Sequence, residues 1–92
     1  MSEGGPLERT ATIVNQRGLH ARAAARFVRT AETFDARVEV TRDDMTVAGT
    51  SILGLMLLAA GAGTVLTLRA EGADAEAALT TLCDLIARGF DE

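Results

Sequence analysis

The chain has 92 residues, of which 48% are hydrophobic, and its formal net charge is −4. This length suits one domain with a limited core, and the hydrophobic content excludes a disordered chain. The negative charge argues against nucleic acid as a partner, because phosphate backbones are bound by basic surfaces. The one cysteine, Cys83, cannot form an internal disulfide, which fits a reducing compartment, and we expect it to be a small core residue.

Residues 1–6 are typical of a short flexible tail, and residues 7–92 of a single domain. The tail lacks the basic and apolar segments of a signal peptide, so we expect a cytoplasmic protein. A membrane span is an alternative, because residues 45–68 contain no charged side chain. Glycines and threonines interrupt this run, and Gly61-Ala62-Gly63 is typical of a turn between two elements. We therefore divide the run into a strand end, a short helix and another strand, and expect no membrane insertion.

The segment from Leu7 to Val14 is rich in β-branched residues and predicts the first strand, although neither alternating face is cleanly apolar. The polar residues from Asn15 to Gly18 predict a loop. From His20 to about Thr33, apolar residues recur at helical spacing and predict a helix. Its buried stripe comprises Ala23, Ala24, Phe27, Val28 and Ala31.

Two short strands follow, and the pair Asp43-Asp44 predicts a tight turn that joins them into a hairpin. The strands cover Arg37–Arg42, which alternates apolar and polar residues, and Met45–Ala48. The segment Gly63–Ala70 predicts the fourth strand.

The segment from Ser51 to Ala60 predicts a second helix with Ser51 at its N-cap. This helix is apolar nearly all round, and so short a helix on a small domain cannot bury every side chain. We expect Ile52 and Leu55 to be buried. Some of the remaining large side chains should be exposed and form a docking surface, namely Leu53, Met56 and Leu57.

The last helix begins after Asp74, which is a candidate cap. Its apolar stripe comprises Ala75, Ala78, Leu79, Leu82 and Ile86. The resulting order β-α-β-β-α-β-α favours an α+β two-layer sandwich, in which the helices cover one face of an antiparallel sheet.

The only histidine, His20, lies where the first strand gives way to the first helix. Near neutral pH an ordinary imidazole offers an unprotonated nitrogen that is a competent nucleophile. A helix N-terminus supplies unpaired N–H groups and a partial positive charge, which stabilise a phosphate. Gly18 allows a tight turn and close approach to an anion. The arrangement predicts a site that accepts a phosphoryl group.

Three arginines recur on one face of this helix, at Arg22, Arg26 and Arg29. We interpret Arg26 and Arg29 as a solvated surface. Arg22 lies in the first turn, where a cation opposes the helix dipole, so we expect it to contact a bound anion. The residues do not support a metal or another cofactor, because one histidine and one cysteine without clustered carboxylates make a poor ligand set. A hydrolase is also unsupported, since there is no second histidine to pair with a nucleophile.

The motif Gly18-Leu19-His20-Ala21-Arg22 resembles the phosphorylation motif of the HPr family, the histidine-containing phosphocarriers of the bacterial sugar phosphotransferase system. A second block, from Thr50 to Ala59, resembles the family's regulatory-serine segment. The similarity extends from about Leu7 to Phe90. It implies an open-faced βαββαβα sandwich with a four-stranded sheet of order 1-4-2-3 and three helices on one face.

The resemblance implies that His20 receives a phosphoryl group on Nδ1 from phosphorylated enzyme I, whose donor is phosphoenolpyruvate. His20 then passes it to a histidine on an A-domain of an enzyme II or on a regulatory relative. Arg22 would stabilise the phosphate, and Gly18, Leu19 and Ala21 would form the supporting loop. The protein would be a relay without turnover of its own, and we expect a monomer.

In some family members a kinase phosphorylates the serine at the position of Ser51, so Ser51 is a candidate regulatory site as well as an N-cap. Two positions depart from the common family pattern: Ala23 replaces a proline, and Thr50 replaces a lysine. The alanine-rich motif without the proline resembles members that serve the nitrogen-related or regulatory branch.

We expect partner proteins to dock on the start of the first helix and on the apolar second helix. The docking residues would be Arg17, Ile52, Leu53, Met56 and Leu57, with Arg22 and Arg26 also facing acidic partners. An alternative hypothesis is a regulatory protein outside transport, whose partner binding depends on phosphorylation of His20 or Ser51.

Overall fold

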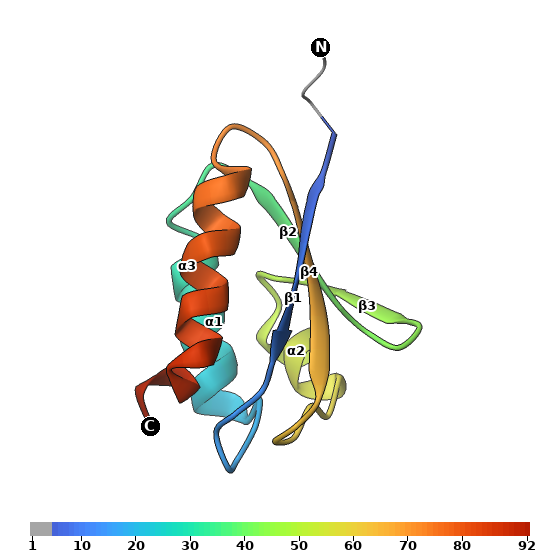
Figure 1. The fold of residues 1–92 in the computed structure, drawn as a ribbon, viewed down its shortest axis with the longest axis vertical. Helices are drawn as coiled ribbons and strands as arrows, with labels where there is room; N and C mark the ends of the chain where they lie inside the picture. Colours follow the sequence, from blue (N-terminus) through green and yellow to red (C-terminus); the bar gives the residue numbers. More distant parts are fainter. Residues whose placement is uncertain (1–4) are drawn as a thin grey trace.

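The computed structural model describes residues 5–92, and its sheet and helices form two layers (Figure 1). The predicted tail at residues 1–6 lies mostly outside the described residues, and the first strand begins at Leu7 as predicted. In chain order the elements of residues 5–92 are β1 (Leu7–Thr12), α1 (Ala21–Ala31), β2 (Arg37–Arg42), β3 (Met45–Ala48), α2 (Ile52–Leu57), β4 (Val65–Glu71), α3 (Ala75–Ala87) and the 3₁₀ turn η1 (Gly89–Asp91).

The four strands form an antiparallel sheet with the order β1-β4-β2-β3, which confirms the predicted topology. β4 lies between β1 and β2, so its alternate residues Leu66, Leu68 and Ala70 are buried under the helices. The residues between them point to the opposite face, which is open to solvent and carries polar side chains such as Thr67 and Arg69. The sheet thus buries one face only, as its alternating sequence requires.

α1 is amphipathic, and all five residues of its predicted apolar stripe are buried. They pack with residues of the sheet and of α3 into one hydrophobic core. The arginine face of this helix is not uniformly solvated, however. Arg26 is half-buried and donates from Nη1 to the carbonyl oxygen of Phe90 at 3.1 Å, so the interpretation of Arg26 as a solvated surface residue was wrong.

α2 is shorter than predicted. Ser51 is its N-cap, and the Ser51 hydroxyl accepts the N–H of Gly54 at 2.9 Å, as predicted. The helix ends at Leu57 because Ala59 adopts a positive φ of 53° and the chain turns away. Arg42 then donates to the carbonyl oxygens of residues 58 and 59 at 2.9 and 2.7 Å, which satisfies groups that the helix leaves unpaired.

The apolar side chains of α2 divide as predicted with one exception. Leu55 is fully buried, whereas Leu53 and Leu57 are 67% and 62% exposed. Met56 is also exposed. The expected burial of Ile52 was wrong, since this side chain is 43% exposed. A helix of six residues presents little more than one side to the core, and only Leu55 occupies that side.

α3 carries its predicted apolar stripe toward the core, but Asp74 does not cap it. The backbone of Asp74 has φ −105° and ψ 23°, which is not the extended conformation of a capping residue. Its carboxylate instead accepts the N–H of Asp35 at 2.7 Å and so fixes the loop between α1 and β2. Cys83 is half-buried against the core, and burial raises the pKa of its thiol.

Three strand boundaries differ from the prediction. β1 ends at Thr12 rather than Val14, because Ile13 turns into the core and pairs with the loop before β4 through Thr64. β4 begins two residues later than predicted, at Val65, and ends one residue later, at Glu71. Among residues 5–92, the structure contains no helix with the length and hydropathy needed to cross a membrane.

Candidate functional site

His20 is the N-cap residue of α1, so its imidazole lies directly at the helix start. The backbone of His20 is extended, with φ −75° and ψ 179°, and its ring nitrogen Nδ1 accepts the N–H of Arg22 at 3.2 Å. The imidazole therefore does for this helix what a serine or aspartate side chain does at most N-caps. This places Nδ1 where the first backbone N–H groups of the helix point.

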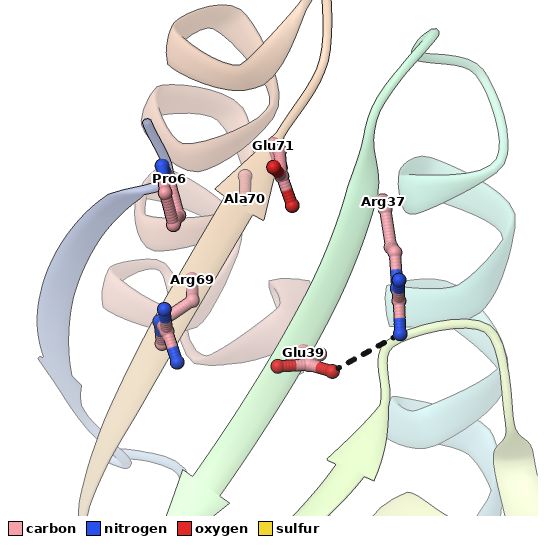
Figure 2. A pocket seen from close by; sticks show the side chains of 6 residues that line it. All are labelled: Pro6, Arg37, Glu39, Arg69, Ala70 and Glu71. Carbon is pink, nitrogen blue, oxygen red and sulfur yellow. Dashed lines mark ion pairs between the residues drawn. The ribbon is translucent and has the colours of Figure 1, made fainter. Parts of the chain in front are cut away.

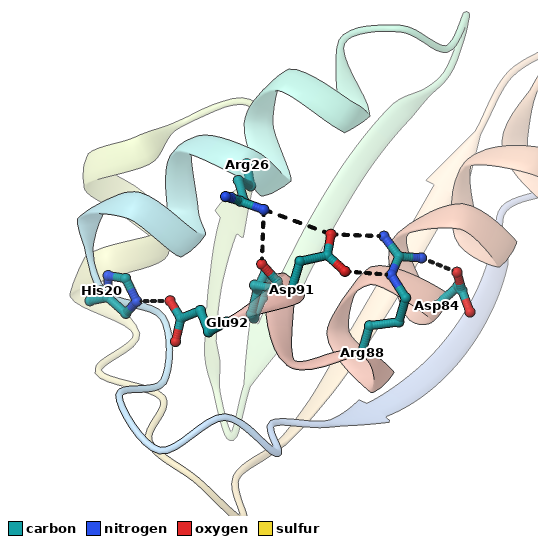
Figure 3. Close-up of polar contacts among 7 residues, drawn as sticks. His20, Arg26, Asp84, Arg88, Asp91 and Glu92 are labelled. Atoms are coloured by element: carbon teal, nitrogen blue, oxygen red, sulfur yellow. Dashed lines mark hydrogen bonds and ion pairs between the residues drawn. The ribbon is translucent and has the colours of Figure 1, made fainter.

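The other ring nitrogen of His20, Nε2, contacts the carboxylate of Glu92 (Figure 3). A carboxylate accepts hydrogen bonds, whereas the N–H of Arg22 donates one, so the two partners assign the tautomer. Nε2 carries the proton and Nδ1 carries the lone pair. The side chains of His20 and Glu92 are 19% and 23% exposed, so solvent reaches both groups.

The hydrogen bond from His20 holds the pKa of Glu92 below its ordinary value, while partial desolvation opposes this effect. A second hydrogen bond to Glu92, from Asn15, lowers the pKa further, and the nearby charge of Arg17 contributes in the same direction. The carboxylate is thus stabilised in its charged form beside the imidazole.

Asn15 connects this carboxylate to the loop before His20. Its amide nitrogen Nδ2 donates to the carbonyl oxygen of Gly18 at 2.9 Å and to Oε1 of Glu92 at 3.1 Å. Asn15 is only 7% exposed, and its Oδ1 has no hydrogen-bond partner within residues 5–92. Since both contacts of Nδ2 are to acceptors, they fix the orientation of the amide.

Of the three residues predicted to support the site, Gly18 and Leu19 fix the loop between β1 and α1. Gly18 has a φ of 66°, a left-handed conformation that disfavours other residues. Leu19 is buried and donates its N–H to the carbonyl oxygen of Ala60 at 3.0 Å. Ala21 is exposed at the first position of α1. The loop is therefore anchored on the segment that follows α2.

The predicted cations lie around the helix start. Arg22 is exposed in the first turn of α1, and Arg17 is exposed in the loop. Arg29 is also exposed but lies two turns further along the helix. Arg22 is thus the cation placed closest to the helix start on α1.

The segment after α3 brings Glu92 to the site, and sequence reasoning missed this contact. Phe90 is fully buried, and Arg26 binds both its carbonyl oxygen and, at 3.7 Å, the carboxylate of Asp91 (Figure 3). Arg88 donates from Nε to Asp91 at 2.9 Å and also pairs with Asp84. These contacts hold the segment against the start of α1. Because His20 and Glu92 are separated by 72 positions in the chain, no local pattern could have signalled their contact.

The exposed residues of α2 form an apolar patch, which we call the α2 surface: Ile52, Leu53, Met56 and Leu57. α2 packs beside α1, and the segment that follows α2 contacts the His20 loop at Gly18 and Leu19. The predicted docking residues therefore gather on the elements that border His20. Ser51, the regulatory candidate, is half-buried with its hydroxyl occupied in capping the helix.

A hollow of ≈ 120 Å³ lies elsewhere on the sheet (Figure 2). It is lined by Pro6, Arg37, Glu39, Arg69, Ala70 and Glu71. Pro6 directly precedes β1, and the other residues belong to the first half of β2 and the end of β4, so the hollow lies at the opposite end of the sheet from the His20 loop. Within residues 5–92, no three His, Cys, Asp or Glu side chains gather as a metal-binding group.

The fold and the site define a small α+β domain that presents one histidine at a helix N-terminus, where its Nδ1 accepts a backbone N–H. The family model for the "PTS HPr component phosphorylation site" matches residues 7–88. The phosphocarrier protein HPr of Neisseria meningitidis is 48% identical over 86 residues, covering 94% of this chain and 97% of the relative. The phosphocarrier protein NPr of Shewanella violacea is 43% identical over 86 residues, covering 94% of each.

Among solved structures, HPr-C-His from Thermoanaerobacter tengcongensis superposes with a TM-score of 0.89 at 45% identity. The match covers 94% of this chain and 97% of that one. The chain therefore belongs to the HPr family of phosphocarrier proteins of the bacterial phosphotransferase system. Members of this family relay phosphate and are not enzymes with turnover of their own. HPr and NPr relatives match at similar identity.

Proposed function

We propose that His20 accepts a phosphoryl group on Nδ1 from phosphorylated enzyme I and passes it to a histidine on an enzyme II A-domain or a regulatory relative. The observation that carries this proposal is the hydrogen bond from the N–H of Arg22 to Nδ1 at 3.2 Å. It identifies Nδ1 as the nitrogen with a lone pair, and it places that nitrogen at the positive end of α1.

The same helix end serves the product of the transfer. Once Nδ1 bonds to phosphorus, it no longer accepts the N–H of Arg22, and a phosphoryl oxygen takes over as the acceptor. The helix start therefore stabilises the histidine before transfer and the phosphate after it. Transfer needs no metal in this scheme, because the backbone N–H groups and the guanidinium of Arg22 supply the positive charge.

Incubation with phosphoenolpyruvate and enzyme I tests the proposal. We expect one phosphate per chain that is labile in acid and stable in alkali, as a phosphohistidine is. Adding an enzyme II A-domain should then discharge the label. A chain that stays unlabelled would contradict the carrier role. A chain that is labelled but never discharged would instead favour a regulatory protein.

Replacing Arg22 by alanine should slow phosphoryl transfer about 10- to 100-fold, the loss expected for one charge-assisted hydrogen bond to the phosphate. The exposed side chain makes no contribution to the core, so the melting temperature should not change. Initial rates of transfer from enzyme I measure the effect. Arg29→Ala removes an equally exposed arginine two turns away and should transfer at the normal rate. Equal rates for the two variants would remove Arg22 from the site.

We also propose that the α2 surface and Arg17 form the docking surface for the partner proteins. The apolar side chains of α2 lie beside the elements that carry His20, and Leu53 and Leu57 are among the most exposed large apolar side chains of residues 5–92. Clustered exposed apolar groups near a reactive residue are typical of a protein interface, and the exposed cation at Arg17 favours acidic partners.

Replacing Leu53 and Leu57 together by serine should raise the KM for enzyme I about 30-fold, since two leucines buried at an interface contribute about 1 kcal/mol each. The limiting rate should change less, because His20 is untouched. Leu7→Ser is the control: this side chain is 42% exposed but begins β1 at the far end of the sheet. A KM unchanged in the double variant, or raised equally in the control, would contradict this docking surface.

A further inference from the structure

The segment after α3 places the carboxylate of Glu92 against Nε2 of His20. Nε2 is the ring nitrogen opposite Nδ1, the proposed acceptor of the phosphoryl group. Nδ1 faces the N–H of Arg22. Nε2 faces Glu92 (Figure 3). We propose that Glu92 is a positioning residue for phosphoryl transfer, which holds the proton on Nε2 and leaves the Nδ1 lone pair available throughout the reaction. This inference rests on the proposed function and assigns a role to a residue outside the phosphorylation motif.

Each carboxylate oxygen of Glu92 has a partner that holds the side chain in place. Oε2 contacts His20, and Oε1 accepts from Nδ2 of Asn15 at 3.1 Å. Asn15 is buried and also donates to the carbonyl oxygen of Gly18 at 2.9 Å. The carboxylate is therefore tied to the same loop that positions His20, so the ring and its partner are oriented as one unit.

The backbone that carries Glu92 adopts an unfavourable conformation. Phe90 and Asp91 have φ angles of 57° and 62°, in the left-handed region that costs free energy for residues other than glycine. The buried ring of Phe90 and the hydrogen bond from Arg26 to its carbonyl hold the chain in this turn. Such conformations persist only where surrounding contacts determine them, and here the result is a carboxylate delivered to His20.

The chemistry of the step explains why the proton must stay on Nε2. The Nδ1 lone pair attacks phosphorus, and the bond between phosphorus and its donor atom on enzyme I breaks with its electron pair leaving on that atom. The imidazole, which keeps the Nε2 proton, becomes a cationic phosphoimidazole. The negative charge of Glu92 lies against that proton and offsets the new positive charge.

The onward transfer uses the same proton. The acceptor's nucleophile attacks phosphorus, the bond from Nδ1 to phosphorus breaks, and its electron pair returns to Nδ1. With Nε2 still protonated, the leaving group is a neutral imidazole, which is a far better leaving group than an imidazolate anion. The contact with Glu92 thus assists both directions of the relay.

Nitrogen-15 NMR of the His20 ring provides a readout that is independent of enzyme I. Spectra of the neutral imidazole should show one tautomer in the wild type, with the proton on Nε2. Glu92→Gln replaces the charged acceptor by an amide that either accepts from Nε2 or donates to it, so both tautomers should be populated. Glu76→Gln, the same change at an exposed position of α3, should leave the spectrum unchanged.

Transfer rates give the second readout. Glu92→Gln should accept phosphate from enzyme I roughly tenfold more slowly, the scale seen when the partner that orients a functional histidine is removed. Glu92→Asp keeps the charge but is one methylene shorter, so it should behave like Glu92→Gln. If Glu92→Asp accepts phosphate as fast as the wild type, a negative charge near His20 is enough for normal transfer without direct contact to Nε2. That result would overturn the positioning role of Glu92.

The outcomes separate this inference from the function on which it rests. If the wild type is labelled but Glu92→Gln keeps a single tautomer and the normal rate, the inference is wrong and the phosphocarrier role stands. If the wild type is never labelled, the proposed function fails and the role of Glu92 in transfer fails with it. A mixed tautomer together with slower transfer, both absent in Glu76→Gln, supports the inference.

Discussion

Replacement of His20 by alanine should abolish phosphorylation by enzyme I while leaving the domain folded. No other histidine exists in the chain, so no second imidazole can accept the phosphoryl group. The variant also loses the N-cap hydrogen bond to the N–H of Arg22, which should cost about 1 kcal/mol of stability. Acid-labile label after incubation with phosphoenolpyruvate and enzyme I measures the first effect, and thermal unfolding measures the second.

His20→Asn separates the two roles of the histidine. The asparagine side chain is a good N-cap and should restore most of the lost stability, but it offers no nucleophilic ring nitrogen. We therefore expect a variant with nearly normal stability and no label. Acid-labile label that persists in either variant would mean that the phosphate sits elsewhere, and the carrier mechanism through His20 would have to be abandoned.

Replacement of Gly18 by alanine should destabilise the domain by about 2–5 kcal/mol and also slow phosphorylation. The left-handed backbone of Gly18, with φ 66°, accounts for about 1–2 kcal/mol of this cost in a residue with a Cβ. The added Cβ would also lie 2.3 Å from the carbonyl oxygen of Ala60, a backbone atom that cannot rotate away. Forcing the loop off this segment should cost about 1–3 kcal/mol more and shift Leu19 and His20.

Two neighbouring glycines provide matched controls for the two parts of this effect. Gly63 has a φ of 90°, but a Cβ there would meet nothing within 4 Å, so Gly63→Ala should show the conformational cost alone. Gly61 has neither a positive φ nor a close neighbour, so Gly61→Ala should lie within about 0.5 kcal/mol of the wild type. Urea unfolding of the three variants measures the series. A Gly18 variant as stable as the Gly63 variant would mean that the loop does not press on Ala60.

Much of this fold could be predicted from local patterns. The hairpin of β2 and β3 agrees with its predicted bounds because alternation and the Asp43-Asp44 turn are both local signals. The buried stripe of α1 follows equally from helical spacing. The end of α2 could not be predicted in this way, since it depends on the positive φ of Ala59 and on Arg42 reaching across from β2 to the carbonyl oxygens just after the helix. Asp74 likewise had a suitable sequence position, but the loop at Asp35 uses its carboxylate.

The candidate site, like the fold, could be predicted from local patterns only in part. The position of His20 at a helix start, with Gly18 before it and Arg22 after it, follows from a few adjacent residues. The contact between His20 and Glu92 does not. Glu92 reaches the imidazole only because α3 and the turn after it return the chain to the start of α1, where Asn15 also binds its carboxylate. Sequence position therefore singles out His20 as the proposed phosphoryl acceptor, whereas the contact of its Nε2 with Glu92 required the structure.

The order of the strands makes the His20 site depend on contacts between distant parts of the chain. β4 lies between β1 and β2, and its pairing with β1 joins residues as far apart as Leu7 and Ala70. The His20 loop leaves β1, and the segment that supports it leads into β4. Contacts between distant parts of a chain form slowly, because the entropy of closing the intervening loop must first be overcome. A chain in which β4 has not yet docked would carry the whole phosphorylation motif and still lack a formed site, so phosphorylation would report completed folding.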